Sequence, residues 1–285
     1  AQLKERDWVS SLMLGSVFRY GVIYYLTFRY AGYYLPFMAP QTMLIFGVVF
    51  PTLGEAVSQE IEKRRVRQLF SRFISPEMVE QLINTQDVTS LNKRSEITVL
   101  FADIRNFTTL SERLSPEEVV NLLNPFLARM TKVIHKHGGT VDKYEGDAIL
   151  AFFGEPVRHE DHALRAARTA RDMRLALVKL IRDWEEKGIL PPNFTFDIGI
   201  GLNSGEVFVG LLGSEERVNY TVIGDNVNLA ARLQDLSKNY DSAIIISEST
   251  EQAISNEFET KFIDSVHVKG RSEAVNIYAL LDHQT

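Results

Sequence analysis

Two aspartates occupy positions where a carboxylate can project into a crevice. Asp103 stands at the end of an apolar run that begins at Glu96, and Asp147 opens the next strand after the turn at Glu145-Gly146. If these strands are neighbours, the two carboxylates share a site and repel each other unless a cation lies between them. Hard oxygen ligands suit Mg²⁺ or Mn²⁺. Each aspartate alone is as consistent with an ordinary turn, but the pair predicts a divalent metal site.

Two further motifs carry polar groups suited to phosphate. In the stretch Tyr220–Arg232, Asn228 and Arg232 are four residues apart on a predicted helix, so they share one face. A planar guanidinium there is apt for phosphate, although an exposed polar face is the simpler alternative. The second motif, Val268-Lys269-Gly270, places a lysine before a glycine turn and has little meaning alone.

Taken together, in this order and spacing, the motifs resemble the class III adenylyl/guanylyl cyclase catalytic domain from about Phe70 to Leu281. The resemblance implies an adenylate cyclase that converts ATP to 3′,5′-cyclic AMP and pyrophosphate with two divalent metal ions, Mg²⁺ or Mn²⁺. It assigns the metals to Asp103, Asp147 and the carbonyl group of Ile104. It assigns the phosphates to the backbone of Asn106, Phe107 and Thr108.

The resemblance also assigns roles to five side chains: Lys143 and Thr221 to the purine, Asn228 to the ribose, Arg232 to charge in the transition state, and Lys269 to the triphosphate, with Arg271 as a less favoured substitute. Family members are head-to-tail homodimers with shared active sites. Each site takes its metal aspartates from one chain and its purine pair, asparagine and arginine from the other. Some relatives carry a phosphate-binding arginine on the strand where this chain has Ile198-Gly199-Ile200.

The purine pair favours ATP over GTP. Lysine only donates hydrogen bonds, so Lys143 can pair with the N1 acceptor of adenine but would face the N1–H of guanine unpaired. The Thr221 hydroxyl can accept from the adenine amine, but it could also rotate to donate to guanine O6. Lys143 therefore argues for ATP, whereas Thr221 only permits it. The alternatives are a guanylate cyclase of the same fold and a catalytically silent nucleotide-binding dimerisation module.

The order of predicted elements places these residues on a ferredoxin-like βαββαβ domain of the α/β (α+β) class. A capping box at Ser115–Glu118 opens a helix that stops at Gly138-Gly139. The other predicted elements are the strands Glu96–Phe101, Thr140–Tyr144, Asp147–Phe152, Phe196–Asn203, Val207–Leu211 and Ala243–Ile246, and the helices Asp161–Lys187 and Asp225–Ser237.

The N-terminal segment differs from the rest of the chain. Two apolar stretches, Val9–Phe28 and Leu35–Leu53, are each about long enough to cross a bilayer. They predict a transmembrane hairpin in residues 1–57, a helical signalling linker in 58–94 and the catalytic domain in 95–285. The basic run that starts at Lys63 would face the cytoplasm. A buried helical hairpin in a soluble protein is the alternative.

The hairpin resembles the membrane-helix tail of a CHASE2-type sensor receptor, which implies a receptor in the bacterial inner membrane with its catalytic domain in the cytoplasm. The net charge of −6 argues against a nucleic-acid partner, because such proteins usually carry a basic footprint. The absence of cysteine excludes disulfides and thiolate metal sites.

Overall fold

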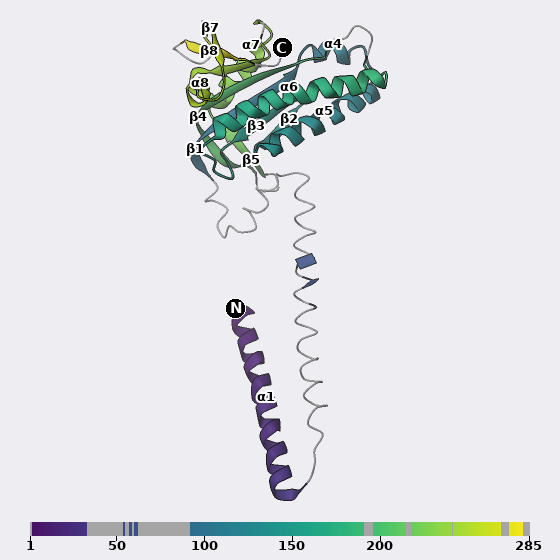
Figure 1. The fold of residues 1–285 in the computed structure, drawn as a ribbon, viewed down its shortest axis with the longest axis vertical. Coiled ribbons are helices and arrows are strands. Elements are labelled where there is room, and N and C mark those ends of the chain that lie inside the picture. Colours follow the sequence, from purple (N-terminus) through teal and green to yellow (C-terminus); the bar gives the residue numbers. More distant parts are fainter. Residues whose placement is uncertain are drawn as a thin grey trace. The chain divides into compact units, whose positions relative to one another are not determined.

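The computed structural model describes residues 2–32, 54, 57, 58, 60, 61, 92–190, 196–214, 218–240, 242–268 and 274–281. The chain divides into two compact units, Ala1–Phe73 and Ile74–Thr285. In the first unit, helix α1 spans Gln2–Ala31 (Figure 1).

The first predicted membrane span lies inside α1, but the prediction is not supported. Within the described residues, no helix has the combination of length and apolar character that crossing a bilayer requires. The charge of Arg19 and the many serine and tyrosine hydroxyls lower the apolar character of Val9–Phe28. The second predicted span, Leu35–Leu53, and most of the linker 58–94 lie outside the described residues.

The second unit contains the predicted βαββαβ order. It consists of β1 (Lys93–Ile104), α5 (Pro116–Lys136), β2 (Thr140–Glu145), β3 (Ala148–Phe153), α6 (His162–Glu186) and β4 (Ile198–Gly213). These four strands lie in the order β2-β3-β1-β4 and pair antiparallel throughout. The ferredoxin-like arrangement that the sequence predicts is therefore confirmed.

The sheet is larger than this unit, with eight strands in the described part of the chain. The remaining elements are α4 (Phe107–Ser111), β5 (Val218–Ile223), α7 (Asp225–Leu236), β6 (Ile244–Ser247), α8 (Glu248–Ile254), β7 (Thr260–Val266) and β8 (Val275–Leu280). The prediction of two strands between Phe196 and Leu211 is wrong. The segment is one strand, because β1 pairs with it without interruption from Ile198 to Val209.

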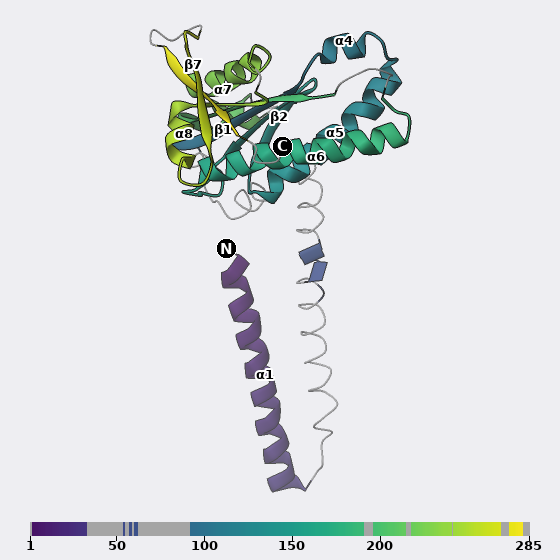
Figure 2. The same ribbon diagram turned by 45° about the horizontal axis from the view of Figure 1, so that its top comes forward.

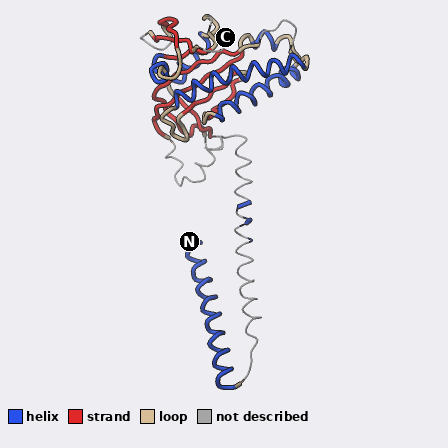
Figure 3. Tube along the Cα trace, viewed as in Figure 1, coloured by secondary structure: helices blue, strands red, loops and turns tan. Residues whose placement is uncertain are grey.

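Helices α5 and α6 lie side by side on one face of the sheet (Figures 1 and 2). Their buried side chains, among them Phe126 and Trp184, pack with alternate strand residues such as Leu100 and Ile200 into the main apolar core. The predicted capping box is present, because Ser115 and Glu118 each accept a hydrogen bond from the other's backbone N–H. The tube in Figure 3 shows the two helices beside the strands.

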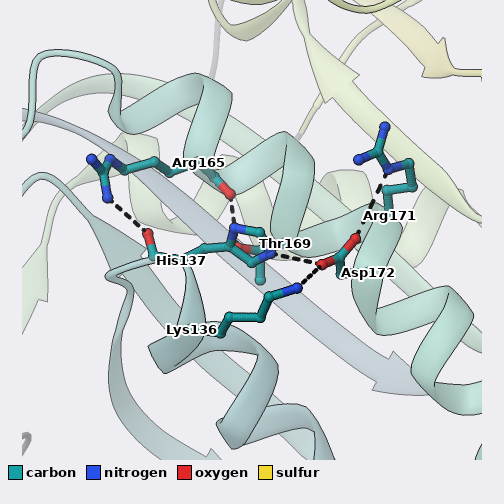
Figure 4. Close-up of polar contacts among 6 residues, drawn as sticks. All are labelled: Lys136, His137, Arg165, Thr169, Arg171 and Asp172. Atoms are coloured by element: carbon teal, nitrogen blue, oxygen red, sulfur yellow. Dashed lines mark hydrogen bonds and ion pairs between the residues drawn. The ribbon is translucent and has the colours of Figure 1, made fainter.

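A cluster of polar side chains joins the end of α5 to α6 (Figure 4). The Asp172 carboxylate accepts from Lys136 at 2.8 Å and from His137 at 2.9 Å. The Arg165 guanidinium donates to the carbonyl oxygen of His137 at 3.3 Å. Burial acts to raise the pKa of Asp172, but hydrogen bonds and charge from Lys136 and His137 together outweigh it and hold the pKa below its ordinary value. The cluster therefore ties the C-terminal end of α5 to α6.

Helix α7 packs against β4 on the other face of the sheet, and glycines in β4 permit its close approach. A Cβ atom on Gly201 would lie 2.2 Å from the carbonyl oxygen of Ala230 and 2.4 Å from the backbone nitrogen of Gln234. Both contacts are shorter than real Cβ contacts, so only glycine fits. Farther along β4, Asn203 donates to the Asn226 carbonyl at 2.9 Å. These contacts set the position of α7, which carries two of the predicted site residues.

Candidate active site

The strand pairing brings Asp103 and Asp147 together. Asp103 is the penultimate residue of β1, Asp147 directly precedes β3, and Ala102 of β1 pairs with Ile149 of β3. The Asp103 carboxyl group and the backbone of Ile104 both interact with the Asp147 carboxyl group. Burial first, and then the neighbouring Asp103, raise the pKa of Asp147 to about 7. The neighbouring carboxyl group disfavours the ionised form of Asp147.

This pair fits a divalent cation by its chemistry. A metal ion would take the place of the proton on Asp147 and remove the repulsion between the two carboxylates. Magnesium typically takes only one or two carboxylates and fills its other positions with water and substrate phosphates. The described residues contain no cluster of three or more acidic or histidine side chains arranged for a metal. The two aspartates and the Ile104 carbonyl are thus too few ligands to fill the coordination sphere of a metal ion. Phosphate oxygens of a nucleotide could supply the remaining ligands.

A lysine that the sequence did not single out lies beside the carboxylates. The Lys238 Nζ atom, just after α7, is 3.7 Å from Asp103 Oδ2 and 3.2 Å from Asp235 Oδ1. Lys238 follows Asp235 by three residues, a spacing that predicts only an ion pair on the helix surface. No neighbouring residue in the sequence indicates that the end of α7 reaches the end of β1. Packing of α7 on β4 places it there.

Lys143 and Thr221, far apart in the sequence, also meet. Lys143 lies on β2 and Thr221 on β5. Strand β5 pairs with β4 outside the main strand order of the sheet. The Lys143 Nζ atom donates to Thr221 Oγ1 at 3.3 Å. Thr221 is 5% exposed, whereas the Lys143 side chain is 44% exposed. The two residues that the family resemblance assigns to the purine therefore form one polar group with a solvent-facing side.

Asp142 is a member of this group that sequence reasoning missed. The Thr221 hydroxyl donates to Asp142 Oδ2 at 2.8 Å, and the Lys143 ammonium lies 3.3 Å from the same oxygen. Alternation along a regular strand would point residues 142 and 143 to opposite faces, but β2 has a register shift between Val141 and Lys143. Burial raises the pKa of Asp142, and the Thr221 and Lys143 donors oppose that rise.

Asn228 and Arg232 share one side of α7, as their spacing predicts. Asn228 is exposed and Arg232 is half-buried. The Arg232 Nη1 atom is buried and makes no hydrogen bond to any part of the chain that the structure describes. It lies 4.0 Å from Asp225 Oδ1, too far for a hydrogen bond. A guanidinium nitrogen without a hydrogen-bond acceptor is suited to an incoming anion.

The predicted phosphate-binding backbone follows Asp103 directly. Asn106 adopts a left-handed conformation with φ of 58°, which asparagine tolerates, and it precedes α4, where Phe107 and Thr108 lie. Arg105 fixes the start of this turn, because its guanidinium donates to the carbonyls of Ser237 at 2.7 Å and Ser242 at 2.9 Å. Lys269 and Arg271 lie outside the described residues.

The structure explains why β4 carries no arginine at the position noted in the sequence. Ile198 and Ile200 are fully buried in the core beneath α5 and α6, where a charge would be costly. A Cβ atom on Gly199 would lie 2.1 Å from Ser237 Oγ. An arginine in this strand segment would therefore have to displace the Ser237 side chain on one face or place a charge in the core on the other.

Comparison with known proteins agrees with this arrangement. The model of the adenylate and guanylate cyclase catalytic domain matches residues 89–282, more than half of the chain. An adenylate cyclase of Anabaena cylindrica is 38% identical over 223 residues, which cover 76% of this chain and 42% of that protein. This chain belongs to the adenylate and guanylate cyclase family, and it spans less than half of the length of the curated relatives it matches.

Two solved structures show the same fold. The adenylyl cyclase CyaB from P. aeruginosa is 38% identical with a TM-score of 0.62, and the match covers 67% of this chain and 96% of that one. The guanylyl cyclase Cya2 is 39% identical with a TM-score of 0.61, covering 66% of this chain and 93% of that one. Sequence identity to these two structures therefore does not distinguish an adenylyl from a guanylyl cyclase.

Proposed function

We propose that this chain is an adenylate cyclase that converts ATP to 3′,5′-cyclic AMP and pyrophosphate. The observation that carries the proposal is the 3.3 Å contact between Lys143 Nζ and Thr221 Oγ1. It supports a base-reading pair in which Lys143 donates to the N1 acceptor of adenine while Thr221 faces the amine. Guanine would present an N1–H to the lysine, and an unpaired buried donor is costly.

The family resemblance supplies the proposed roles of the other residues. Asp103, Asp147 and the Ile104 carbonyl would hold the two divalent ions, Mg²⁺ or Mn²⁺, and the turn from Asn106 to Thr108 would approach the phosphates. When bound, such ions lower the pKa of an attacking hydroxyl and neutralise phosphate charge. The ribose 3′-oxygen forms a bond to the α-phosphorus, the bond to pyrophosphate breaks, and the hydroxyl proton passes to solvent.

Side chains from α7 would act on the same reaction. Asn228 would orient the ribose, and Arg232 would stabilise the charge that develops in the transition state, with Lys269 on the triphosphate. The buried Nη1 atom of Arg232, which makes no hydrogen bond within the described residues, supports this role. The scheme assigns no side-chain base, because bound divalent ions would lower the pKa of the hydroxyl.

The proposal includes a homodimer with shared active sites. Arg232 makes its ion pair within the described residues with Asp225, at 4.0 Å, and makes none with Asp103 or Asp147. A head-to-tail dimer would bring the aspartates of one chain to the purine pair, Asn228 and Arg232 of the other.

Attachment of the chain to the bacterial inner membrane, with the catalytic domain in the cytoplasm, is a separate proposal. It rests on the sequence of residues 35–53 and on the basic residues that follow. Sedimentation of the full chain with membranes tests it, and recovery of the chain in the supernatant without detergent would contradict it.

The test of activity is product analysis with ATP and GTP offered together at equal concentration. Cyclic AMP should form in strong excess over cyclic GMP. Equal amounts would favour a purine pair that does not discriminate, and an excess of cyclic GMP would make the chain a guanylate cyclase. Absence of both products, with nucleotide binding retained, would favour the silent dimerisation module.

A further inference from the structure

Asp142 holds a position that the roles above do not use. Its side chain is 1% exposed although the neighbouring Lys143 side chain is 44% exposed. One of its oxygens, Oδ2, receives the Thr221 hydroxyl at 2.8 Å and lies 3.3 Å from the Lys143 ammonium. A buried carboxylate with two donors aimed at it is satisfied in its ionised form, which can only accept.

This contact determines what the Thr221 hydroxyl can offer to a ligand. A threonine hydroxyl has one hydrogen and two lone pairs. When its hydrogen is directed to Asp142, the oxygen can act only as an acceptor toward anything on its other side. A free hydroxyl could instead rotate and donate, which is why the residue type alone does not discriminate between an amine and a carbonyl.

Asp142 also restrains the second member of the pair. Because Lys143 Nζ lies near both Asp142 Oδ2 and Thr221 Oγ1, one donor and one acceptor are presented next to each other. The edge of a 6-aminopurine offers the complementary pattern, an acceptor at N1 beside a donor at the 6-position. A 6-oxopurine offers the reverse at both atoms.

We propose that Asp142 is a positioning residue that fixes the polarity of the Lys143–Thr221 pair and thereby selects 6-aminopurine over 6-oxopurine nucleotides. The inference rests on the proposed function, because it concerns the same base-reading site. The buried Asp142 carboxylate, at the register shift in β2, would then make the distinction between amine and carbonyl that Thr221 cannot make alone.

Three nucleotides separate the contributions. Inosine triphosphate differs from ATP only along the edge in question, with a 6-oxo group and an N1–H. Purine riboside triphosphate keeps the N1 acceptor and lacks the 6-amine, so its ratio to ATP reports the Thr221 contact while the Lys143 contact cancels. Each ratio of kcat/KM values is measured within one protein preparation, so a reduced folded fraction leaves it unchanged.

The informative variant is Asp142→Asn in the full chain. The asparagine amide can donate to Thr221 Oγ1, which releases the hydroxyl hydrogen toward a 6-oxo group. The preference of the wild type for ATP over inosine triphosphate should be about 100-fold or more and should fall at least about tenfold in the variant. The preference for ATP over purine riboside triphosphate should fall as well.

Two comparisons distinguish this role from a general structural one. Glu145→Gln removes the same charge from the exposed end of β2 and should leave both ratios unchanged. In a Thr221→Val background, Asp142→Asn should change the ratio of ATP to purine riboside triphosphate by less than about twofold, because the hydroxyl it controls is gone.

Retention of both ratios in Asp142→Asn, within about twofold of the wild type, would overturn the inference and leave the cyclase proposal intact. An equal loss of both ratios in Glu145→Gln would also overturn it, since charge alone would then be responsible. A wild-type protein that cyclises none of the three nucleotides would instead overturn the proposed function, and the inference would fall with it.

Discussion

The carboxyl groups of Asp103 and Asp147 interact with each other where β1 ends and β3 begins. The pKa of Asp147 is raised from an ordinary 3.8 to about 7 by burial and by Asp103. Between these two values the folded metal-free protein binds more protons than the unfolded chain. Stability contributed by this group is therefore lost as the pH rises from about 4 to about 7.

The first prediction is a pH-dependent effect of Asp147→Asn on the metal-free protein. The amide cannot ionise, so the variant avoids the loss that the wild type suffers as the pH rises. In the presence of a chelator, its melting temperature should exceed that of the wild type at pH 8 by clearly more than at pH 5. Thermal unfolding followed by circular dichroism measures the difference. An equal difference at both pH values would show that Asp147 does not titrate in this range.

The second prediction concerns metal dependence. Asp103→Ala should lower cyclase activity by several orders of magnitude, because removal of a ligand disables a two-metal site. Mn²⁺ should raise the melting temperature of the wild type, and Asp103→Ala should abolish that rise. The matched control is Asp183→Ala on α6, whose carboxylate lies 3.9 Å from Arg129 and belongs to no site. Near-full activity of Asp103→Ala would refute the assignment.

The third prediction tests how α7 is positioned. Gly201→Ala would place a methyl group 2.2 Å from the Ala230 carbonyl oxygen, so the helix must shift. Overpacking of this kind costs about 1–3 kcal/mol of unfolding free energy. Activity should fall further than stability alone explains, because Asn228 and Arg232 move with the helix.

Urea unfolding and cyclase activity are measured together for this variant. The control is Gly21→Ala in α1, where an added methyl group meets nothing within 4 Å. Wild-type stability and activity in Gly201→Ala would mean that α7 does not rest on β4 as described.

Local signals predicted much of the fold and part of the site. The capping box at Ser115 and the turn before Asp147 depend on neighbouring residues, so they could be found in the sequence. The pairing of β1 with β3 then followed from the βαββαβ order. The uninterrupted β4 was missed because Gly205 resembles a strand break, although in the fold it is the place where Asn226 packs on the strand.

Residues that depend on tertiary packing could not be found in this way. Asp142 reaches Thr221 only because β2 shifts register at that point and β5 lies within reach of β2. Lys238 reaches Asp103 only because glycine residues let α7 lie directly on β4. Neither contact is indicated by the residues next to Asp142 or Lys238 in the sequence, so a single sequence does not predict it.

The last prediction is that two chains share each active site. Asp103→Ala and Arg232→Ala should each be almost inactive as homodimers, because both sites of each dimer carry a lesion. When the two proteins are mixed and exchange subunits, one site of the mixed dimer receives both lesions. The other receives an intact Asp103 from one chain and an intact Arg232 from its partner, so activity should return.

The recovered activity should stay below that of the wild type, because only some dimers are mixed and each has one working site. Specific activity of the wild type should also fall on dilution, because dilution favours the monomer and a monomer cannot complete a site. Subunit exchange is monitored independently by energy transfer between differently labelled chains. If exchange occurs and the mixture of Asp103→Ala with Arg232→Ala stays inactive, each chain must build its sites alone, and the head-to-tail arrangement is wrong for this protein.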